Sequence, residues 1–169
     1  EVGLLQLASI VGPFVNFWPE SLTTSIIYWV YRIELFTMDP RVEQQRFYYQ
    51  ILDDYIESIK NKRQVVLVGH SLGGGLAKII GARHGIPSIA FSGPGTVMSR
   101  KKLGLSLDSI NRIDVNVKPG VDMVAKIDEV GGLVQNIDCN ENFVKCHSLV
   151  RTVRNLITYC GPLDPNKGR

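Results

Sequence analysis

Apolar residues dominate the first forty positions and predict two helical segments there. An uncharged apolar run over 2–18 contains the pair Gly12-Pro13 near its middle, so it predicts a short helix followed by a turn. A second apolar helix is predicted over 20–36, where charged residues interrupt the run before it could cross a bilayer. Two interpretations of residues 2–36 stay open: burial against the rest of a larger domain, or a lid-like or interfacial surface that meets lipid.

The next segment has the periodicity of an amphipathic helix. The pair Asp39-Pro40 is typical of a helix start, with the aspartate as N-cap and the proline in the first turn. We predict that this helix ends near Lys60 and is followed by a short turn at 61–63. Apolar residues recur along it at the helical spacing, at Leu52, Tyr55, Ile56 and Ile59.

From residue 65 onward, strand patterns alternate with helical patterns. In the third strand, Arg112, Asp114 and Asn116 alternate with apolar residues, which predicts one exposed face. Alternation of strands and helices favours an α/β fold, with a mostly parallel sheet and helices on both of its faces. Strands are predicted over 65–68, 86–91, 112–117 and 133–137, and helices over 76–83, 96–103 and 148–159.

Length and composition fit one domain. The chain has 169 residues, of which 44% are hydrophobic, so we predict a single domain over 1–169 that contains an apolar helical, lid-like segment over 1–38. The formal net charge of +3 and the scattered basic residues argue against nucleic-acid binding. Three late cysteines permit either one disulfide or three ordinary thiols, at Cys139, Cys146 and Cys160.

One stretch carries a chemical signature. The predicted strand over 65–68 runs into Gly-His-Ser-Leu-Gly at 69–73, a Gly-X-Ser-X-Gly pattern followed by a predicted helix. A strand, a sharp turn and a helix in this order are typical of the nucleophile elbow, which exposes a serine at the edge of a sheet. Because the turn strains the backbone, we expect Gly69 and Gly73 to be required for their lack of a Cβ. The pattern predicts that Ser71 is a nucleophile; the alternative is a glycine-rich turn that happens to hold a serine.

A serine nucleophile needs a base, and the sequence contains three histidines. His70 is adjacent to Ser71, and in a sharp turn its ring cannot face its neighbour's hydroxyl, so we interpret it as a packing or loop-bonding residue. His84 ends the helix after the elbow, where the helix dipole favours a cation. His147 lies in a loop before the last helix and is therefore the predicted base.

The acid that orients the base should follow the elbow in the sequence and lie at the carboxyl edge of the sheet. Asp122 fits because it comes just past the strand over 112–117 and its Pro-Gly turn. Asp128 is the alternative acid, unless it is a solvated turn residue, and Asp114 lies within a strand. The other carboxylates after the elbow are Asp108, Glu129, Asp138 and Glu141.

These motifs resemble the class 3 (fungal-type) lipase family. Residues 65–78 are similar to the elbow of that family, and Phe-Ser-Gly-Pro-Gly at 91–95 is similar to the segment that follows it. Residues 116–124 resemble its acid motif, although Ala125 stands where proline is usual. Cys-His-Ser at 146–148 resembles its histidine motif, especially in the subgroup that includes autophagic vacuolar lipases. The resemblance implies an α/β-hydrolase fold and hydrolysis of esters in acylglycerols or phospholipids, without a metal or cofactor.

The oxyanion hole of this fold needs two backbone donors. The N–H of Leu72, the residue after the serine, is the expected first donor. The second should come from a loop after an upstream strand, yet nothing before Gln64 has a strand pattern. We therefore expect the chain to begin after the first strands of the sheet, with the second donor further upstream.

We predict serine-dependent hydrolysis of carboxylic ester bonds in lipids through Ser71, Asp122 and His147, with an acyl-enzyme intermediate. Two alternatives stay open: a short-chain esterase, thioesterase or acyltransferase on the same fold, and an inactive lipid-binding lipase-like module. The expected partners are a lipid ester and a lipid interface contacted by residues 2–36. The resemblance and the permitted disulfide favour a secretory or endolysosomal, vacuole-like compartment.

Overall fold

A computed structural model describes residues 49–161 of the chain. By its internal contacts the chain divides into two units, residues 1–38 and 39–169, and every described residue belongs to the second. The apolar helices predicted over 2–36 and the helix start predicted at Asp39-Pro40 lie outside the described residues.

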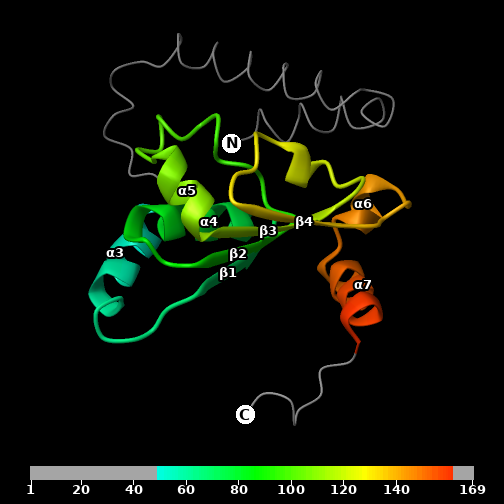
Figure 1. Cartoon of the computed structure of the whole chain (residues 1–169), viewed down its shortest axis with the longest axis horizontal. Helices are drawn as coiled ribbons and strands as arrows, with labels where there is room; N and C mark the ends of the chain where they lie inside the picture. Colours follow the sequence, from blue (N-terminus) through cyan, green and yellow to red (C-terminus); the bar gives the residue numbers. More distant parts are fainter. Residues whose placement is uncertain (1–48, 162–169) are drawn as a thin grey trace. The chain divides into compact units, whose positions relative to one another are not determined.

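The described residues form a four-stranded parallel sheet with helices packed against it, which confirms the predicted α/β fold (Figure 1). The strands are neighbours in the order in which they follow along the chain, and each pair is parallel. The carboxyl ends of all four strands therefore meet at one edge of the sheet. The strands are β1 (Leu67–His70), β2 (Ser88–Phe91), β3 (Asp114–Pro119) and β4 (Leu133–Ile137).

Helix α4 (Leu72–His84) is the centre of the hydrophobic core. It contacts β1, β2 and β3, and α3 (Gln50–Ile59) and α5 (Leu107–Ile113) pack against it. Eight of its 13 residues are buried, which is expected for a helix that is apolar around its whole circumference. It ends at His84, as the sequence predicts, and Gly85 follows with a left-handed φ of 66°. Ile80 and Ile110 are fully buried between these helices and the sheet.

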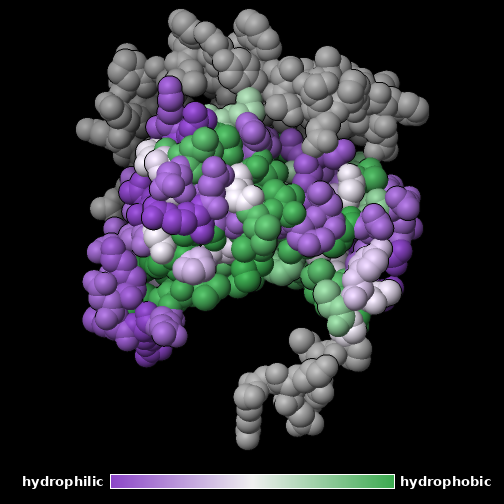
Figure 2. Space-filling view, in the orientation of Figure 1, coloured by the Kyte–Doolittle hydropathy of each residue, from purple (hydrophilic) through white to green (hydrophobic). Residues whose placement is uncertain are grey.

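Within the described residues, two helices follow β4. Helix α6 (Phe143–Cys146) leads into α7 (Leu149–Cys160), which contacts β4 and agrees with the helix predicted over 148–159. At the opposite edge of the sheet from β4, β1 is the outermost described strand. Figure 2 shows apolar surface over β1 and β2. Val66 and Val68 are 57% and 62% exposed there.

The helix predicted over 96–103 is wrong, because that segment is a series of turns. The backbone N–H groups of residues 96–99 donate to the carboxylate of Asp128 and the carbonyl of Glu129, so the segment is held against the loop after β3 in a series of turns. Helix α5 was not predicted from the sequence. It begins at Ser106, whose hydroxyl accepts a hydrogen bond from the N–H of Ser109.

The prediction that β3 has one exposed polar face is also wrong. Asp114 and Asn116 are 2% and 3% exposed. The Asp114 carboxylate accepts a hydrogen bond from the Ser88 hydroxyl at 2.5 Å, and the Asn116 side-chain oxygen accepts one from Lys78 Nζ at 2.9 Å. Helix α4 thus covers this face and brings a buried ammonium group to it, so the polar side chains pair with one another rather than with water.

Burial changes the protonation of these groups. Loss of hydration lowers the pKa of Lys78 to about 8, although the nearby carboxylates of Asp114 and Asp128 oppose this change. Burial also raises the pKa of Asp114 to about 6, against the hydrogen bond from Ser88 and the charge of Lys78. Asp114 Oδ2 has no hydrogen-bond partner among the described residues. A neutral, protonated carboxylic acid therefore suits this position at mildly acidic pH.

The Asp114 site predicts a pH dependence of stability. The folded protein holds this proton more tightly than the unfolded chain, so between pH 4 and 6 the free energy of unfolding should fall as pH rises, by up to about 3 kcal/mol from this group. In Asp114→Asn the side chain is neutral at every pH, so this component should disappear. Urea unfolding of both proteins at pH 4.5 and 7 measures it. Identical pH dependence in the two proteins would contradict the prediction.

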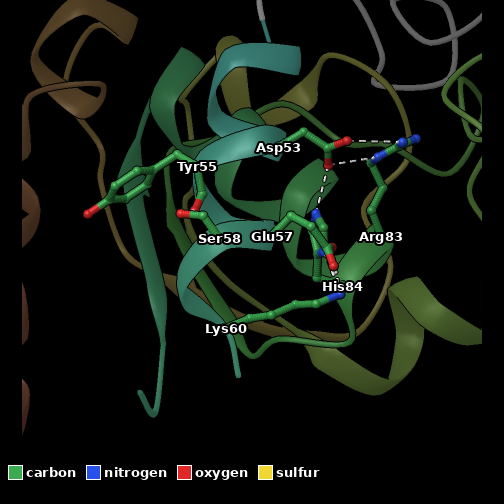
Figure 3. Close-up of polar contacts among 7 residues, drawn as sticks. All are labelled: Asp53, Tyr55, Glu57, Ser58, Lys60, Arg83 and His84. Atoms are coloured by element: carbon green, nitrogen blue, oxygen red, sulfur yellow. Dashed lines mark hydrogen bonds and ion pairs between the residues drawn. The ribbon is translucent and has the colours of Figure 1, made fainter. Parts of the chain in front are cut away.

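A polar network joins α3 to the end of α4 (Figure 3). Asp53 accepts two hydrogen bonds from the guanidinium of Arg83, at 3.0 and 3.1 Å, and lies 2.8 Å from His84 Nε2. Glu57 and Lys60 reach the other ring nitrogen of His84, at 3.2 and 3.3 Å. Partial burial raises the pKa of Asp53, but the hydrogen bonds from Arg83 and His84 together outweigh it, so the pKa lies below its usual value.

This network predicts that Asp53→Ala destabilises the fold. The variant leaves the Arg83 and His84 side chains without their shared carboxylate, and we expect the free energy of unfolding to fall by about 1–2 kcal/mol at neutral pH. Chemical denaturation measures the change. Asp54→Ala is the matched control, because Asp54 is its exposed neighbour on the same helix. Equal effects of the two substitutions would show that the network adds nothing.

Candidate active site

Ser71 lies in a sharp turn between β1 and α4. Its φ of 57° and ψ of −127° fall in a region that residues with a side chain rarely adopt. The N–H of Ser71 donates to the carbonyl of Phe91 at 3.0 Å, at the end of β2. The Ser71 carbonyl in turn accepts from the N–H groups of Gly74 and Gly75 in the first turn of α4. Hydrogen bonds on both sides therefore hold the strained residue in place.

The turn is possible because strand and helix approach each other closely. A Cβ on Gly69 would lie 2.1 Å from the carbonyl oxygen of Gly73, so the expectation for Gly69 is confirmed. The expectation for Gly73 finds no steric support, because a Cβ there would meet no described atom within 4 Å beyond its chain neighbours and the backbone of its own helix. The second close approach involves Gly74 instead, where a Cβ would lie 3.2 Å from the Cα of Gly93. A Cβ on Gly75 would also be tight, at 3.0 Å from a proline ring.

Three side chains that are distant in the sequence form one chain of hydrogen bonds. His147 Nε2 lies 2.9 Å from Ser71 Oγ, and His147 Nδ1 lies 3.0 Å from both carboxylate oxygens of Asp122. Because the carboxylate can only accept, we assign the ring proton to Nδ1, which leaves Nε2 free to accept the serine proton. The structure thus brings together the three residues that the sequence singled out.

Asp122 is fully buried and is held by its own loop. Its Oδ1 accepts hydrogen bonds from the N–H of Val124 at 2.9 Å and from that of Ala125 at 3.4 Å, in the short 3₁₀ helix η3 (Val124–Lys126). Ala125 occupies the position at which proline is usual in the resembling family, and proline could not donate this bond. The carboxylate is therefore oriented from two directions, by its backbone and by the histidine.

The alternative acid, Asp128, has another role. Its carboxylate accepts from the N–H groups of Met98 and Ser99 at 2.8 and 3.0 Å, and from the Ser99 hydroxyl at 2.7 Å. It is buried, with a φ of 63°, so the interpretation as a solvated turn residue is wrong as well. Asp128 shapes the loop that follows β2 rather than contacting His147.

A short covalent loop carries the histidine. Cys139 and Cys146 form a disulfide, and Cys160 is free and exposed. The bond therefore resolves the pairing that the sequence left open. His147 directly follows Cys146, and its N–H donates to the carbonyl of Phe143 at 2.9 Å. Its side chain is 26% exposed, so the ring is accessible from solvent while its backbone is fixed.

The first turn of α4 presents a backbone donor beside the serine. Leu72 is the first residue of the helix, and the positive end of the helix dipole lies at this N-terminus. Its side chain is 59% exposed. A negative charge that develops near Ser71 would therefore meet the N–H of Leu72 and the helix dipole together.

Residues 49–161 contain neither a metal-binding cluster nor a membrane-spanning helix. In that range no group of three or more His, Cys, Asp or Glu side chains is arranged to hold a metal ion. None of the helices in the same range is long and apolar enough to cross a membrane. His84, at the far end of α4, contacts Asp53 rather than the serine.

The fold and this arrangement define an α/β-hydrolase-like protein. Residues 22–109 match the uncharacterised protein family UPF0227, which is just over half of the chain, and the chain belongs to this family. The matched range includes Ser71 and ends before Asp122 and His147.

Shorter similarities connect the chain to proteins named "Putative lipase ATG15". The chain is 35% identical over 65 residues to that of Vanderwaltozyma polyspora, which covers 37% of this chain and 12% of the relative. It is 35% identical over 68 residues to that of Kluyveromyces lactis, covering 39% and 13%. It is 38% identical over 64 residues to that of Saccharomyces cerevisiae S288c, which covers 37% of this chain and 12% of the relative. The chain thus matches about an eighth of the length of these relatives, and the similarity supports a lipase- or esterase-like hydrolase in general.

The disulfide yields a prediction about stability. It joins two cysteines that are seven positions apart, next to His147, and so restricts the unfolded chain. Its removal in Cys139→Ser/Cys146→Ser should therefore lower the free energy of unfolding by about 2–3 kcal/mol. Urea titration without reductant measures this change. Cys160→Ser is the matched control and should stay within about 0.5 kcal/mol of the parent, because Cys160 is exposed and unpaired. A similarly small change in the double variant would refute the prediction.

Proposed function

We propose that this protein hydrolyses carboxylic ester bonds in lipids, with Ser71 as nucleophile, His147 as general base and Asp122 as the acid that orients His147. The observation that carries the proposal is the continuous chain of hydrogen bonds from Asp122 through His147 to Ser71 Oγ. A serine hydroxyl is a poor nucleophile until such a base takes its proton. A serine with a purely structural role would need neither a strained backbone nor an imidazole aligned with its hydroxyl, so the combination at Ser71 supports a nucleophile.

The proposed reaction has two halves. In the first, Ser71 Oγ attacks the ester carbonyl carbon while His147 Nε2 takes the hydroxyl proton, and the tetrahedral intermediate then collapses. The C–O bond to the alcohol breaks, and His147 returns its proton to the leaving alkoxide, which leaves an acyl-serine. In the second half His147 activates a water molecule, whose attack on the acyl-serine releases the carboxylic acid and restores Ser71. The buried carboxylate of Asp122 stabilises the imidazolium that forms in each half.

The N–H of Leu72 is the proposed donor to the tetrahedral oxyanion. Its place at the first position of α4 supports this role, because the donor and the helix dipole act in the same direction. The loss of one such donor costs about 10²–10³-fold in rate in other hydrolases.

Exposed apolar side chains close to Ser71 and His147 in the sequence support a lipid substrate. Leu72, Val144 and Val150 are 59%, 63% and 70% exposed, and they lie one to three residues from Ser71 or His147 in the sequence. Apolar surface around a reacting serine would favour an acyl chain or a lipid surface over a polar ester. The name of the relatives, putative lipase, also supports a lipid ester as substrate. Contact of residues 2–36 with a lipid interface belongs to this proposal.

A secretory or endolysosomal, vacuole-like compartment is proposed as the location. The disulfide between Cys139 and Cys146 supports it, because such bonds persist where the surroundings are oxidising. The raised pKa of Asp114 also fits an acidic compartment, since its folded form is favoured when that carboxyl is protonated.

Active-site labelling tests the proposal. A fluorophosphonate should add once to the protein, as seen by intact mass, and the adduct should vanish in Ser71→Ala and His147→Ala because only a base-activated serine reacts quickly. Hydrolysis of a short chromogenic ester should fall by at least ~10³-fold in both variants.

Ser92→Ala is the matched control for this experiment. Ser92 is a second serine with a positive φ, 54°, and its buried hydroxyl has no hydrogen-bond partner among the described residues. The control should therefore label like the parent. Full ester turnover in Ser71→Ala would sink the proposal. Faster turnover of soluble short esters than of emulsified lipid would instead favour a short-chain esterase.

A further inference from the structure

We propose that His70 is a positioning residue for the reaction: its imidazole donates a hydrogen bond to the backbone carbonyl of His147 and keeps the base against the serine turn. His70 Nε2 lies 2.8 Å from His147 O, across 77 positions of sequence. The inference rests on the proposed function, because it assigns a task in the same reaction to a residue that does not touch the reacting atoms.

The direction of this hydrogen bond is set by chemistry. A carbonyl oxygen can only accept, so Nε2 of His70 must carry the proton whether the ring is neutral or charged. The two histidine rings also meet directly, with centroids 4.9 Å apart and planes tilted by 41°. His70 therefore contacts both the backbone and the ring of the proposed base.

The strand explains why this residue can reach the base loop. Side chains alternate between the two faces of a strand, and Gly69 is the residue of β1 that meets α4. His70, the last residue of β1, therefore leaves the strand on the opposite face, while the next residue begins the turn. The nucleophile turn and the contact to the base loop thus come from adjacent residues of one rigid strand end.

The other described contacts of His147 come from different elements. Its Nδ1 is held by Asp122 after β3, its N–H by Phe143 in α6, and the residue before it by the disulfide to Cys139. At the end of β1 and the start of α4, His147 forms the hydrogen bond to Ser71 Oγ and the contact with His70. These two contacts fix the separation between base and nucleophile.

The two contacts behave differently during turnover. The bond between His147 Nε2 and Ser71 Oγ is consumed when the serine becomes acylated, whereas the bond from His70 to the His147 carbonyl involves no reacting atom. It can therefore hold the base in place while His147 activates water for the second half of the reaction. Misplacement by about 1 Å can cost on the order of 10²-fold in rate, so a constraint that persists through the cycle is useful.

Two substitutions separate a positioning role from a general packing role. His70→Gln keeps an N–H donor at about the reach of Nε2, and His70→Leu keeps bulk but removes the donor. We expect His70→Leu to lower kcat for a short chromogenic ester about 10- to 100-fold and to lower KM with it, because deacylation becomes the limiting step while kcat/KM changes much less. We expect His70→Gln to recover most of that loss. Val68→Ala, at an exposed position on the same strand, is the control and should leave kcat unchanged.

The expected profile contains a further signature. If the base is displaced in the acyl-serine state, acyl-enzyme should accumulate in His70→Leu and give a burst of product before the slow phase. A parent-like kcat in His70→Leu would overturn the inference, and so would equal losses in the Leu and Gln variants.

A measurement on the unaltered protein tests the inference even where a variant does not fold. Nitrogen-15 NMR of the imidazoles should find the neutral ring of His70 protonated at Nε2, and the ring of His147 protonated at Nδ1. A neutral His70 ring protonated at Nδ1 would overturn the inference by itself.

Failure of the proposed function would look different. It would appear as a lack of fluorophosphonate labelling in the unaltered protein, whatever the tautomer of His70. Failure of the present inference would leave labelling of the unaltered protein intact while His70→Leu turned over at the parent rate.

Discussion

The close approach of β1 and α4 at Gly69 is the constraint on which the site depends. No side chain fits between the Gly69 backbone and the carbonyl of Gly73, so the chain reverses sharply and Ser71 takes a φ of 57°. The strain is offset by hydrogen bonds from Ser71 to β2 and to the first turn of α4. These same bonds fix the direction of the helix, which then forms the centre of the core. Site and core therefore share one local geometry.

The parallel sheet brings distant residues together at one edge. Ser71 follows β1, Asp122 follows β3, and His147 comes after β4, each beyond the carboxyl end of its strand. Parallel strands point the same way, so the loops that follow them gather on one side. The loops are then tied individually, by N–H groups to Asp122, by the disulfide before His147, and by His70 from the strand end. Because these contacts come from different elements, together they restrict the position of the His147 ring.

A buried polar layer lies between α4 and the sheet, with Ser88 and Asp114 at the amino ends of β2 and β3. Lys78 pairs with Asn116, and Asp114 with Ser88, all within the interface between α4 and the strands. Burial costs these groups hydration, and the shifted pKa values of Lys78 and Asp114 express that cost. A hydrogen bond between buried side chains of two neighbouring strands forms in one register only and is lost when a strand slips by one residue. The layer therefore favours the observed register of β2 and β3 over its neighbours.

Local pattern was enough to predict the alternation of strands and helices, the sharp turn at Ser71, the end of α4 at His84, and α7, because each depends on neighbours in sequence. The Ser, Asp and His candidates could be chosen because chain order and the edge of a parallel sheet restrict the choice. Tertiary contacts decided the rest. Residues 96–99 gave their N–H groups to Asp128 and Glu129 and formed turns, and Asp114 and Asn116 became buried because α4 covers them. The pairing of Cys139 with Cys146 and the reach of His70 to His147 likewise arise only in the folded chain. The periodicity of the sequence indicates which face of an element is apolar. Whether a polar side chain is hydrated or bonded to another side chain depends on residues that are distant in the sequence.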